Sequence, residues 1–425
     1  MPLAARSRNI VFVLCAAATV SAAAAASAQT VPATHLTLRA AVAQARTAAP
    51  RLRAAASISD SLRQAAGLAG RRPNPTFELR SENWSPGGRA GSPELDVFAV
   101  LTQPLELGGK RALRRQLAVA DSEIASTALR ALERELALET VRAYIRALKA
   151  HALVETLRQN RAGLTRLVST VGLRVEEGFS AEADLLKFRT EAARIDRDLA
   201  RAELELDRGL AILGTTIGAT APIAASALVE PTPLPLPLPL PTDDAASLAA
   251  AIPRHPEVAA ATAAIDRARQ VVALEHARRF PDPFVTGGYK RTAGFDTVVF
   301  GVAMTLPVFD ANAQTVARAR GIERGAIADR DALVQRLTND AAATVRAARV
   351  LTEQVKRASD DLVAPADGVR RAALAAFREG SADILQLIDA ERVYAEVQRA
   401  VIDLRLETVL TIIEARFALG EEAIP

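Results

Sequence analysis

Apolar residues follow two different spacings along this 425-residue chain. In short segments at 76–84 and 95–106, apolar and polar residues alternate, which predicts strands. Further along, apolar residues recur every three or four positions, the spacing of a coiled-coil seam. The seam residues are Leu138, Val141, Ile145, Leu148 and Ala152. This pattern predicts long helices over 110–177 and 181–214.

The same order of elements returns after a proline-rich linker at 230–243, EPTPLPLPLPLPTD, which can form neither helix nor central strand. The second set of expected elements comprises strands at 284–291 and 296–307 and helices at 313–378 and 383–419. Pro104 and Pro307 are 203 residues apart, and Gly178 and Gly380 are 202 apart. Such near-constant offsets indicate an internal duplication, with halves at 29–229 and 244–425.

The lengths of these elements predict an assembly of several copies. A helix of about 60 residues spans roughly 90 Å, so it needs packing partners along its whole length. Each half has only one hairpin, and an isolated hairpin is marginal in water. We therefore expect the strands to pair with those of other copies, so that three copies would supply about twelve strands.

The last predicted strand has one apolar face and one face of small or polar residues. The apolar face carries Val298, Phe300, Val302, Met304 and Leu306. The other face carries Thr297, Val299, Gly301, Ala303 and Thr305. This alternation suits a wall between lipid and a lumen, because lipid tolerates strands only when they close into a barrel.

The first thirty residues predict export. Arg6 and Arg8 precede an alanine-rich apolar run that ends in small residues at Ala26 and Ala28, the pattern of a cleaved signal peptide over 1–28. An uncleaved membrane anchor is the alternative, which the A-x-A site disfavours. The single cysteine, Cys15, lies within this segment, so we expect the exported chain to contain neither disulfide nor thiolate metal site.

Composition and motifs argue against several classes of function. Acidic and basic residues are interspersed at a formal net charge of +4, which does not indicate nucleic acid binding. No later apolar stretch reaches the roughly 18 residues of a spanning helix, so the chain would enter a membrane through strands. The four histidines are scattered, without a zinc motif or nucleophile elbow. We expect no catalytic residue, cofactor or metal site.

Four segments together resemble the TolC-type outer-membrane efflux factors, and in particular the CzcC-like proteins of heavy-metal efflux. They are PNPTFEL, LTQPLELGGKR, LPVFDANAQ and FREGSADILQLIDAERVYAE. The resemblance spans nearly the whole mature chain. It implies a mainly α protein with a small β-barrel portion, in which a homotrimer forms a twelve-stranded barrel in outer-membrane lipid above a long helical periplasmic tunnel.

The resemblance also implies a location and partners. The protein would lie in the outer membrane of a Gram-negative bacterium, with a large periplasmic portion. It would dock with a periplasmic adaptor, or membrane fusion protein, and an inner-membrane RND-type pump. The linker at 230–243 would belong to an equatorial region at mid-height. Substrates, chiefly divalent heavy-metal cations, would pass passively through the channel.

The two helix-to-helix corners are the periplasmic tips in this family. Candidates for adaptor docking are Gly178, Phe179, Ser180, Gly380 and Ser381. Family members place acids six and nine residues after the second corner glycine, and of these only Asp389 is acidic here. Candidates for the gate or constriction are Asp389, Gln386, Asp383 and Asp184. The simpler interpretation is a helix C-cap at each glycine and an exposed acid near a helix start at Asp389.

The segments between strands and long helices would be the descent from barrel to tunnel. Proline would end strand pairing, and glycine would permit the bend before the helix. The candidate residues are Pro104, Gly108, Gly109, Pro307 and Asp310. Either Asp310 or Asn312 is expected to cap the following helix.

Other functions remain open at this stage. A trimeric duct accounts for signal, duplication, helices and strands together, but its cargo could also be drugs or proteins of type I secretion. A periplasmic coiled-coil scaffold that forms no channel would explain the helices and leave the strands without partners. An envelope enzyme would need a catalytic constellation that the sequence does not show.

Overall fold

The structure is a computed structural model, and it describes residues 35–83, 95–229 and 245–422. All of them belong to one unit, His35–Pro425. The predicted signal peptide and the proline-rich linker lie outside the described residues.

The elements follow the duplicated order. The first half contains α1 (Leu38–Ala48), α2 (Pro50–Leu68), β1 (Thr76–Glu82), β2 (Asp96–Pro104), α3 (Lys110–Glu176) and α4 (Glu182–Thr216). The second contains α5 (Ala245–Ala251), α6 (Pro256–Ala277), β3 (Pro283–Thr292), β4 (Phe295–Met304), α7 (Ala313–Ala358), α8 (Ala364–Arg378) and α9 (Ile384–Ala418). Short 3-10 helices span Ala225–Ala227 and Ile252–Arg254. The mainly helical fold with a small antiparallel sheet confirms the predicted fold class.

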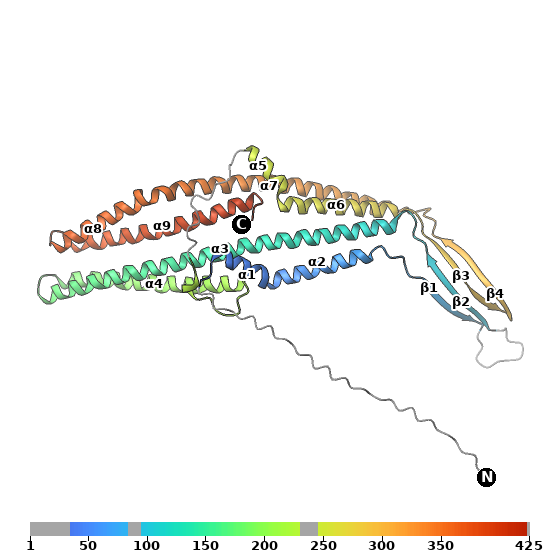
Figure 1. Cartoon of the computed structure of the whole chain (residues 1–425), viewed down its shortest axis with the longest axis horizontal. Helices are drawn as coiled ribbons and strands as arrows, with labels where there is room; N and C mark the ends of the chain where they lie inside the picture. The colour runs from blue at the N-terminus through green and yellow to red at the C-terminus, as the bar shows by residue number, and fades with distance from the viewer. Residues whose placement is uncertain (1–34, 84–94, 230–244, 423–425) are drawn as a thin grey trace, which may run out of the picture. The chain divides into compact units, whose positions relative to one another are not determined.

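Long helices pack lengthwise against one another (Figure 1). With 67 residues, α3 is about 100 Å long. It contacts α4, α2 and α6, while α7 contacts α6 and α9. The predicted seam is the buried stripe of α3, in which Val141, Ile145 and Leu148 are all buried. Small and branched side chains at this spacing let neighbouring helices interdigitate along their length.

The helix predicted over 313–378 is interrupted in the structure. A π-helical segment, Ser359–Val363, separates α7 from α8. Pro365 lies at the start of α8 and has no N–H to donate, so a regular α-helical hydrogen bond cannot form across this point. Widening into a π turn is a common way for a helix to accommodate such a break.

Four strands form one antiparallel sheet in the order β1-β2-β3-β4 (Figure 1). The two hairpins come from different halves of the sequence and join through β2 and β3, where Leu101 lies opposite Gly287. β1 and β4 are the edge strands. Their outer backbone groups pair with no strand in the described part of the chain.

One face of this sheet is apolar and exposed. The register aligns Leu79 with Ala99, Tyr289 and Val298, and it aligns Phe77 with Leu101, Gly287 and Phe300. Val298 and Phe300 are 87% and 76% exposed. The opposite face includes Glu78, Arg80, Thr102, Thr286, Lys290 and Thr297. The predicted alternation in the last strand therefore extends across all four strands.

In the described ranges, no helix is both long enough and apolar enough to cross a membrane.

Tyr144 on α3 holds together two distant segments of the chain. Its hydroxyl lies 2.7 Å from the carbonyl oxygen of Leu36 and 2.6 Å from that of Val229, which share its single proton, and it accepts from the Val229 N–H. Leu36 and Leu228 form a parallel β-bridge beside it. The side chain is fully buried, and this burial raises the pKa of the phenol, although the bond to Val229 opposes the shift. The phenol therefore remains a neutral donor at physiological pH.

Replacing this hydroxyl tests the importance of the anchor. Tyr144→Phe removes the hydroxyl from both carbonyl groups and leaves the Leu36 carbonyl with only the longer bond from the Val229 N–H at 3.4 Å, so we expect a loss of about 1–3 kcal/mol in unfolding free energy. Thermal unfolding followed by far-UV circular dichroism measures the effect. Tyr394→Phe on α9 is the matched control, because no hydrogen bond of the Tyr394 hydroxyl occurs in the described structure. Equal melting temperatures for both variants would contradict the anchoring role.

Candidate functional site

A largely buried ion pair holds the junction between strands and helices together. Lys110, the first residue of α3, is 8% exposed, and its ammonium group contacts Asp282 at 2.8 Å and donates to the Phe280 carbonyl. Asp282 also accepts from the Leu107 N–H at 2.9 Å. Lys110 belongs to the first half and Asp282 to the second. The pair therefore fixes the two strand-to-helix connections to each other.

A second ion pair joins the same junction to α2. Glu106 accepts two hydrogen bonds from the guanidinium of Arg114. Arg114 also donates to the carbonyls of Ala69 and Arg71, just beyond the end of α2. A forked guanidinium suits this role, because it can bind one carboxylate and free backbone carbonyls together.

The predicted glycines lie in this turn. Gly108 and Gly109 have φ of 68° and 73°, a conformation that favours glycine. A side chain at Gly108 would also meet Phe280 at 3.0 Å. β2 ends at Pro104, two residues before the end of the predicted strand, and the next residue, Leu105, still donates to the Pro283 carbonyl.

The second half makes the turn differently from the prediction. Asn312 occupies the N-cap position of α7, with φ of 59°, but neither it nor Asp310 forms a side-chain cap to the helix. Asp310 instead accepts from the Asn312 N–H at 2.8 Å. The amide of Asn312 donates to the backbone and side chain of Glu275 on α6. A tertiary contact has thus replaced the expected cap. Pro307 lies three residues after β4 and is exposed.

The two corners between long helices have matching backbone geometry. Gly178 and Gly380 have φ of 80° and 76°. At the first corner, Phe179 N–H donates to Arg174 O; at the second, Ser381 N–H donates to Ala376 O. Both sets of bonds terminate a helix in the manner of a glycine C-cap. The Phe179 side chain is 79% exposed, so the first corner presents an aromatic ring to its surroundings.

Beneath these corners, the two helical hairpins share one apolar cluster. Phe188 of α4 packs edge-on against Phe377 of α8, with ring centroids 6.4 Å apart. The buried residues of the cluster are Leu164, Val171, Leu185, Phe188, Phe377, Ile384, Leu387 and Ile388. The hairpins therefore form one packed body at the corners.

The four predicted gate residues lie on two helices and do not share one environment. Asp383, Gln386 and Asp389 are exposed at the start of α9, spaced by three residues. Leu387 and Ile388 on the same helix point into the apolar cluster. Asp184 on α4 instead pairs with Lys187 at 3.2 Å. Only the α9 residues thus present a polar stripe free of ion pairs among the described residues.

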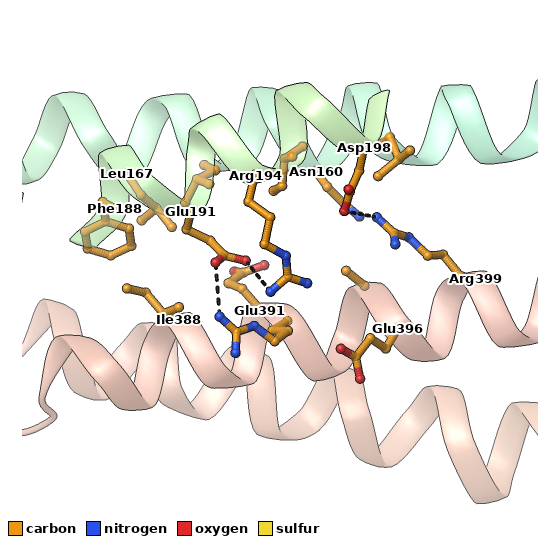
Figure 2. Close-up of a pocket in the computed structure, with 15 residues that line it drawn as sticks. Asn160, Leu167, Phe188, Glu191, Arg194, Asp198, Ile388, Glu391, Glu396 and Arg399 are labelled. Atoms are coloured by element: carbon orange, nitrogen blue, oxygen red, sulfur yellow. Dashed lines mark hydrogen bonds and ion pairs between the residues drawn. The ribbon is translucent and has the colours of Figure 1, made fainter. Parts of the chain in front are cut away.

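The structure also shows a charged contact that the sequence did not predict (Figure 2). Glu191 of α4 reaches Arg392 of α9 at 3.1 Å and Arg194 at 3.5 Å. One heptad further along, Asp198 reaches Arg399 at 3.7 Å. Both acids are on α4 and both partner arginines on α9. A seven-residue repeat of opposite charges on two helices could have indicated this contact.

Glu191 and Arg392 line a pocket between α3, α4 and α9, and Glu391 lies in the same pocket (Figure 2). The charges around Glu391 differ from those around Glu191. Burial raises the pKa of its carboxyl. Arg370, 3.8 Å away, opposes the shift, and Asp367 adds to it. Asp367 is tied to Arg370 at 2.7 Å, and this hydrogen bond holds the pKa of Asp367 below its usual value. Arg370 is therefore shared between two acids.

Metal-binding groups of three or more histidine, cysteine or acidic side chains do not occur in the described residues.

Comparison with known proteins agrees with this geometry. The sequence pattern of the outer membrane efflux protein family matches residues 41–219 and 248–421. The cobalt-zinc-cadmium resistance protein CzcC of Cupriavidus metallidurans is 27% identical over 366 residues, covering 84% of this chain and 83% of CzcC. The nickel-cobalt-cadmium resistance protein NccC of Alcaligenes xylosoxydans xylosoxydans is 25% identical over 243 residues, covering 56% of this chain and 53% of NccC.

Solved structures share the fold. A crystal structure of CusC, described in connection with transmembrane channel formation, superposes with a TM-score of 0.77 at 17% identity, covering 90% of this chain and 92% of CusC. This chain and CusC thus share one fold. The chain belongs to the outer membrane efflux protein family, which confirms the resemblance stated from its motifs. It is an efflux channel protein of the outer membrane rather than an enzyme.

The raised pKa of Glu391 predicts a pH-dependent effect on stability. A carboxyl whose pKa is higher in the folded state favours folding when protonated, so its contribution is lost as pH rises through the folded pKa. Glu391→Gln keeps the neutral form at every pH. We expect this variant to melt above the wild type at neutral pH and level with it under acid conditions.

Thermal melts across a pH series measure this difference. Glu396→Gln, an exposed position on the same helix, is the control and should follow the wild type throughout. A lower melting temperature of Glu391→Gln at neutral pH would show instead that the attraction to Arg370 outweighs burial.

Proposed function

We propose that this protein works as a homotrimer whose twelve strands close into one barrel, continuous with a helical tunnel in the periplasm. The observation that carries this proposal is the open four-stranded sheet. Both of its edge strands lack partners in the described chain, and one face is apolar and exposed. Closing the sheet with two further copies would give the backbone N–H and C=O groups of β1 and β4 hydrogen-bond partners and would turn the apolar face toward lipid.

Cross-linking between the edge strands tests the trimer. Within one chain β1 and β4 are three strand spacings apart, roughly 14 Å, whereas a disulfide requires Cα atoms within about 7 Å. Double-cysteine variants, with one residue in β1 and one in β4 on the same sheet face, such as Glu78→Cys with Val299→Cys, can therefore cross-link only between copies. For at least one register, we expect oxidation to give covalent species up to trimers on denaturing gels.

A pair on the central strands provides the matched control. Thr102 and Thr286 lie opposite each other, with hydroxyls 3.2 Å apart, so Thr102→Cys with Thr286→Cys should close within a chain and leave the mass unchanged. The single native cysteine, Cys15, lies in the predicted signal peptide. If every double-cysteine variant with one cysteine in β1 and one in β4 gave only monomers, the closed barrel would be overturned.

We further propose divalent heavy-metal cations as the cargo. The support is the similarity to CzcC and NccC, whose names describe resistance to cobalt, zinc, cadmium and nickel. In this proposal the channel conducts passively, and an inner-membrane RND-type pump acts through a periplasmic adaptor. The adaptor would dock at the corners, where Phe179 exposes an aromatic ring and Gly178, Ser180, Gly380 and Ser381 complete the tips.

At the constriction we propose that Asp389 is the gate residue, with Gln386 and Asp383 beside it on the exposed stripe of α9. Three copies of this carboxylate around one axis would attract multivalent cations and repel one another. Asp184 would contribute less, because Lys187 already neutralises it.

Neutralising the gate residue should change conduction. We expect Asp389→Asn to reduce block by multivalent cations and to raise single-channel conductance in planar bilayers, because the ring of like charges that holds those ions is removed. Glu407→Gln, an exposed acid farther along α9, is the matched control and should conduct like the wild type. Unchanged block in Asp389→Asn would remove this residue from the gate.

A further inference from the structure

A basic groove lies beside the junction between strands and helices. It runs along α3 between the end of α2 and part of α6, and Arg71, Arg72, Arg111 and Arg115 line it. All four side chains are exposed. Arg71 and Arg72 lie just before β1, while Arg111 and Arg115 occupy the first two turns of α3. The four charges therefore lie at the level where the apolar sheet begins.

These arginines, defined here as the arginine groove, have no acidic partner. Ion pairs within the described residues involve none of the four side chains; Arg111 donates only to the Gly70 carbonyl. The two acids that line the groove farther along α3 and α6 each have a basic partner outside the groove. Glu123 pairs with Arg130 at 3.2 Å, and Asp266 pairs with Arg269 at 3.0 Å. The groove thus keeps a strong net positive charge.

Exposed apolar side chains begin at the same level as the groove. On α3, Arg111 and Arg115 lie about 60° and 100° around the helix from Arg114, so both can line the groove while Arg114 holds the junction. Leu105 and Leu107, a few residues before Arg111, are large apolar residues that are 43% and 49% exposed. The positive charges of the groove therefore lie beside the start of the apolar zone along the chain.

We propose that the arginine groove binds the phosphate of an anionic phospholipid headgroup in the periplasmic leaflet of the outer membrane. This inference rests on the proposed function, in which the apolar sheet face contacts lipid. Guanidinium groups match phosphate oxygens in pairs of parallel hydrogen bonds, and basic residues beside an apolar membrane zone attract anionic headgroups. The groove would hold the protein at a fixed depth, with its strands in the acyl region.

Binding of fluorescent phosphatidylglycerol to the full-length protein in non-ionic detergent tests this proposal, with fluorescent phosphatidylcholine as the reference lipid. The variant Arg71→Gln/Arg72→Gln/Arg115→Gln removes three charges and leaves the Arg111 hydrogen bond intact. Each basic residue near an anionic surface contributes about fivefold to affinity. We expect the preference for phosphatidylglycerol to fall by about tenfold or more in the triple variant.

A second triple variant controls for net charge. Arg189→Gln/Arg201→Gln/Arg378→Gln removes three exposed arginines from the helices far along the chain from the strands. It should keep the lipid preference of the wild type. An equal loss in both triple variants, or no loss in the groove variant, would overturn the proposal.

Inorganic phosphate distinguishes a lipid from a soluble anion. Millimolar phosphate should leave phosphatidylglycerol bound; complete displacement would assign the groove to a soluble anion and overturn the lipid assignment. Channel conductance separates this inference from the proposed function. The groove variant should still form channels in planar bilayers, whereas a wild type that forms none would refute the channel itself.

Discussion

The unpaired edges of β1 and β4 are the constraint on which the architecture depends. Backbone N–H and C=O groups need partners wherever water is absent, and a sheet of four strands with an exposed apolar face cannot provide them alone. Long helices impose the same requirement in water, because α3 exceeds the diameter of a compact domain. Assembly of several copies would satisfy both at once.

Charged side chains mark the two ends of the long helices. Near the strands, Lys110 and Arg114 form ion pairs that hold the junction together. The four residues of the arginine groove form no ion pair among the described residues. Near the corners, Glu191 and Arg392 link the halves across a pocket. Lys110–Asp282 and Glu191–Arg392 each join residues from the two halves of the chain.

The two halves of the chain differ in detail where their surroundings differ. Gly109 and Asn312 both precede a long helix with positive φ, yet only the second uses its side chain, and it binds Glu275 on α6. A π-helical segment interrupts the second half, where Pro365 stands, whereas α3 runs without a break. The same order of elements thus occurs twice in the chain with different local contacts.

Periodicity and punctuation in the sequence determined the local structure: two hairpins, two helical corners at Gly178 and Gly380, and a seam through Val141 and Ile145. These features depend on residues that are close together in the sequence, so they can be predicted without knowing which segments pack against them. Tertiary structure decided which distant residues meet, such as Glu191 with Arg392, and which arginines stay unpaired. Sequence spacing within one helix does not specify the partner helix, and that choice depends on packing across the whole body.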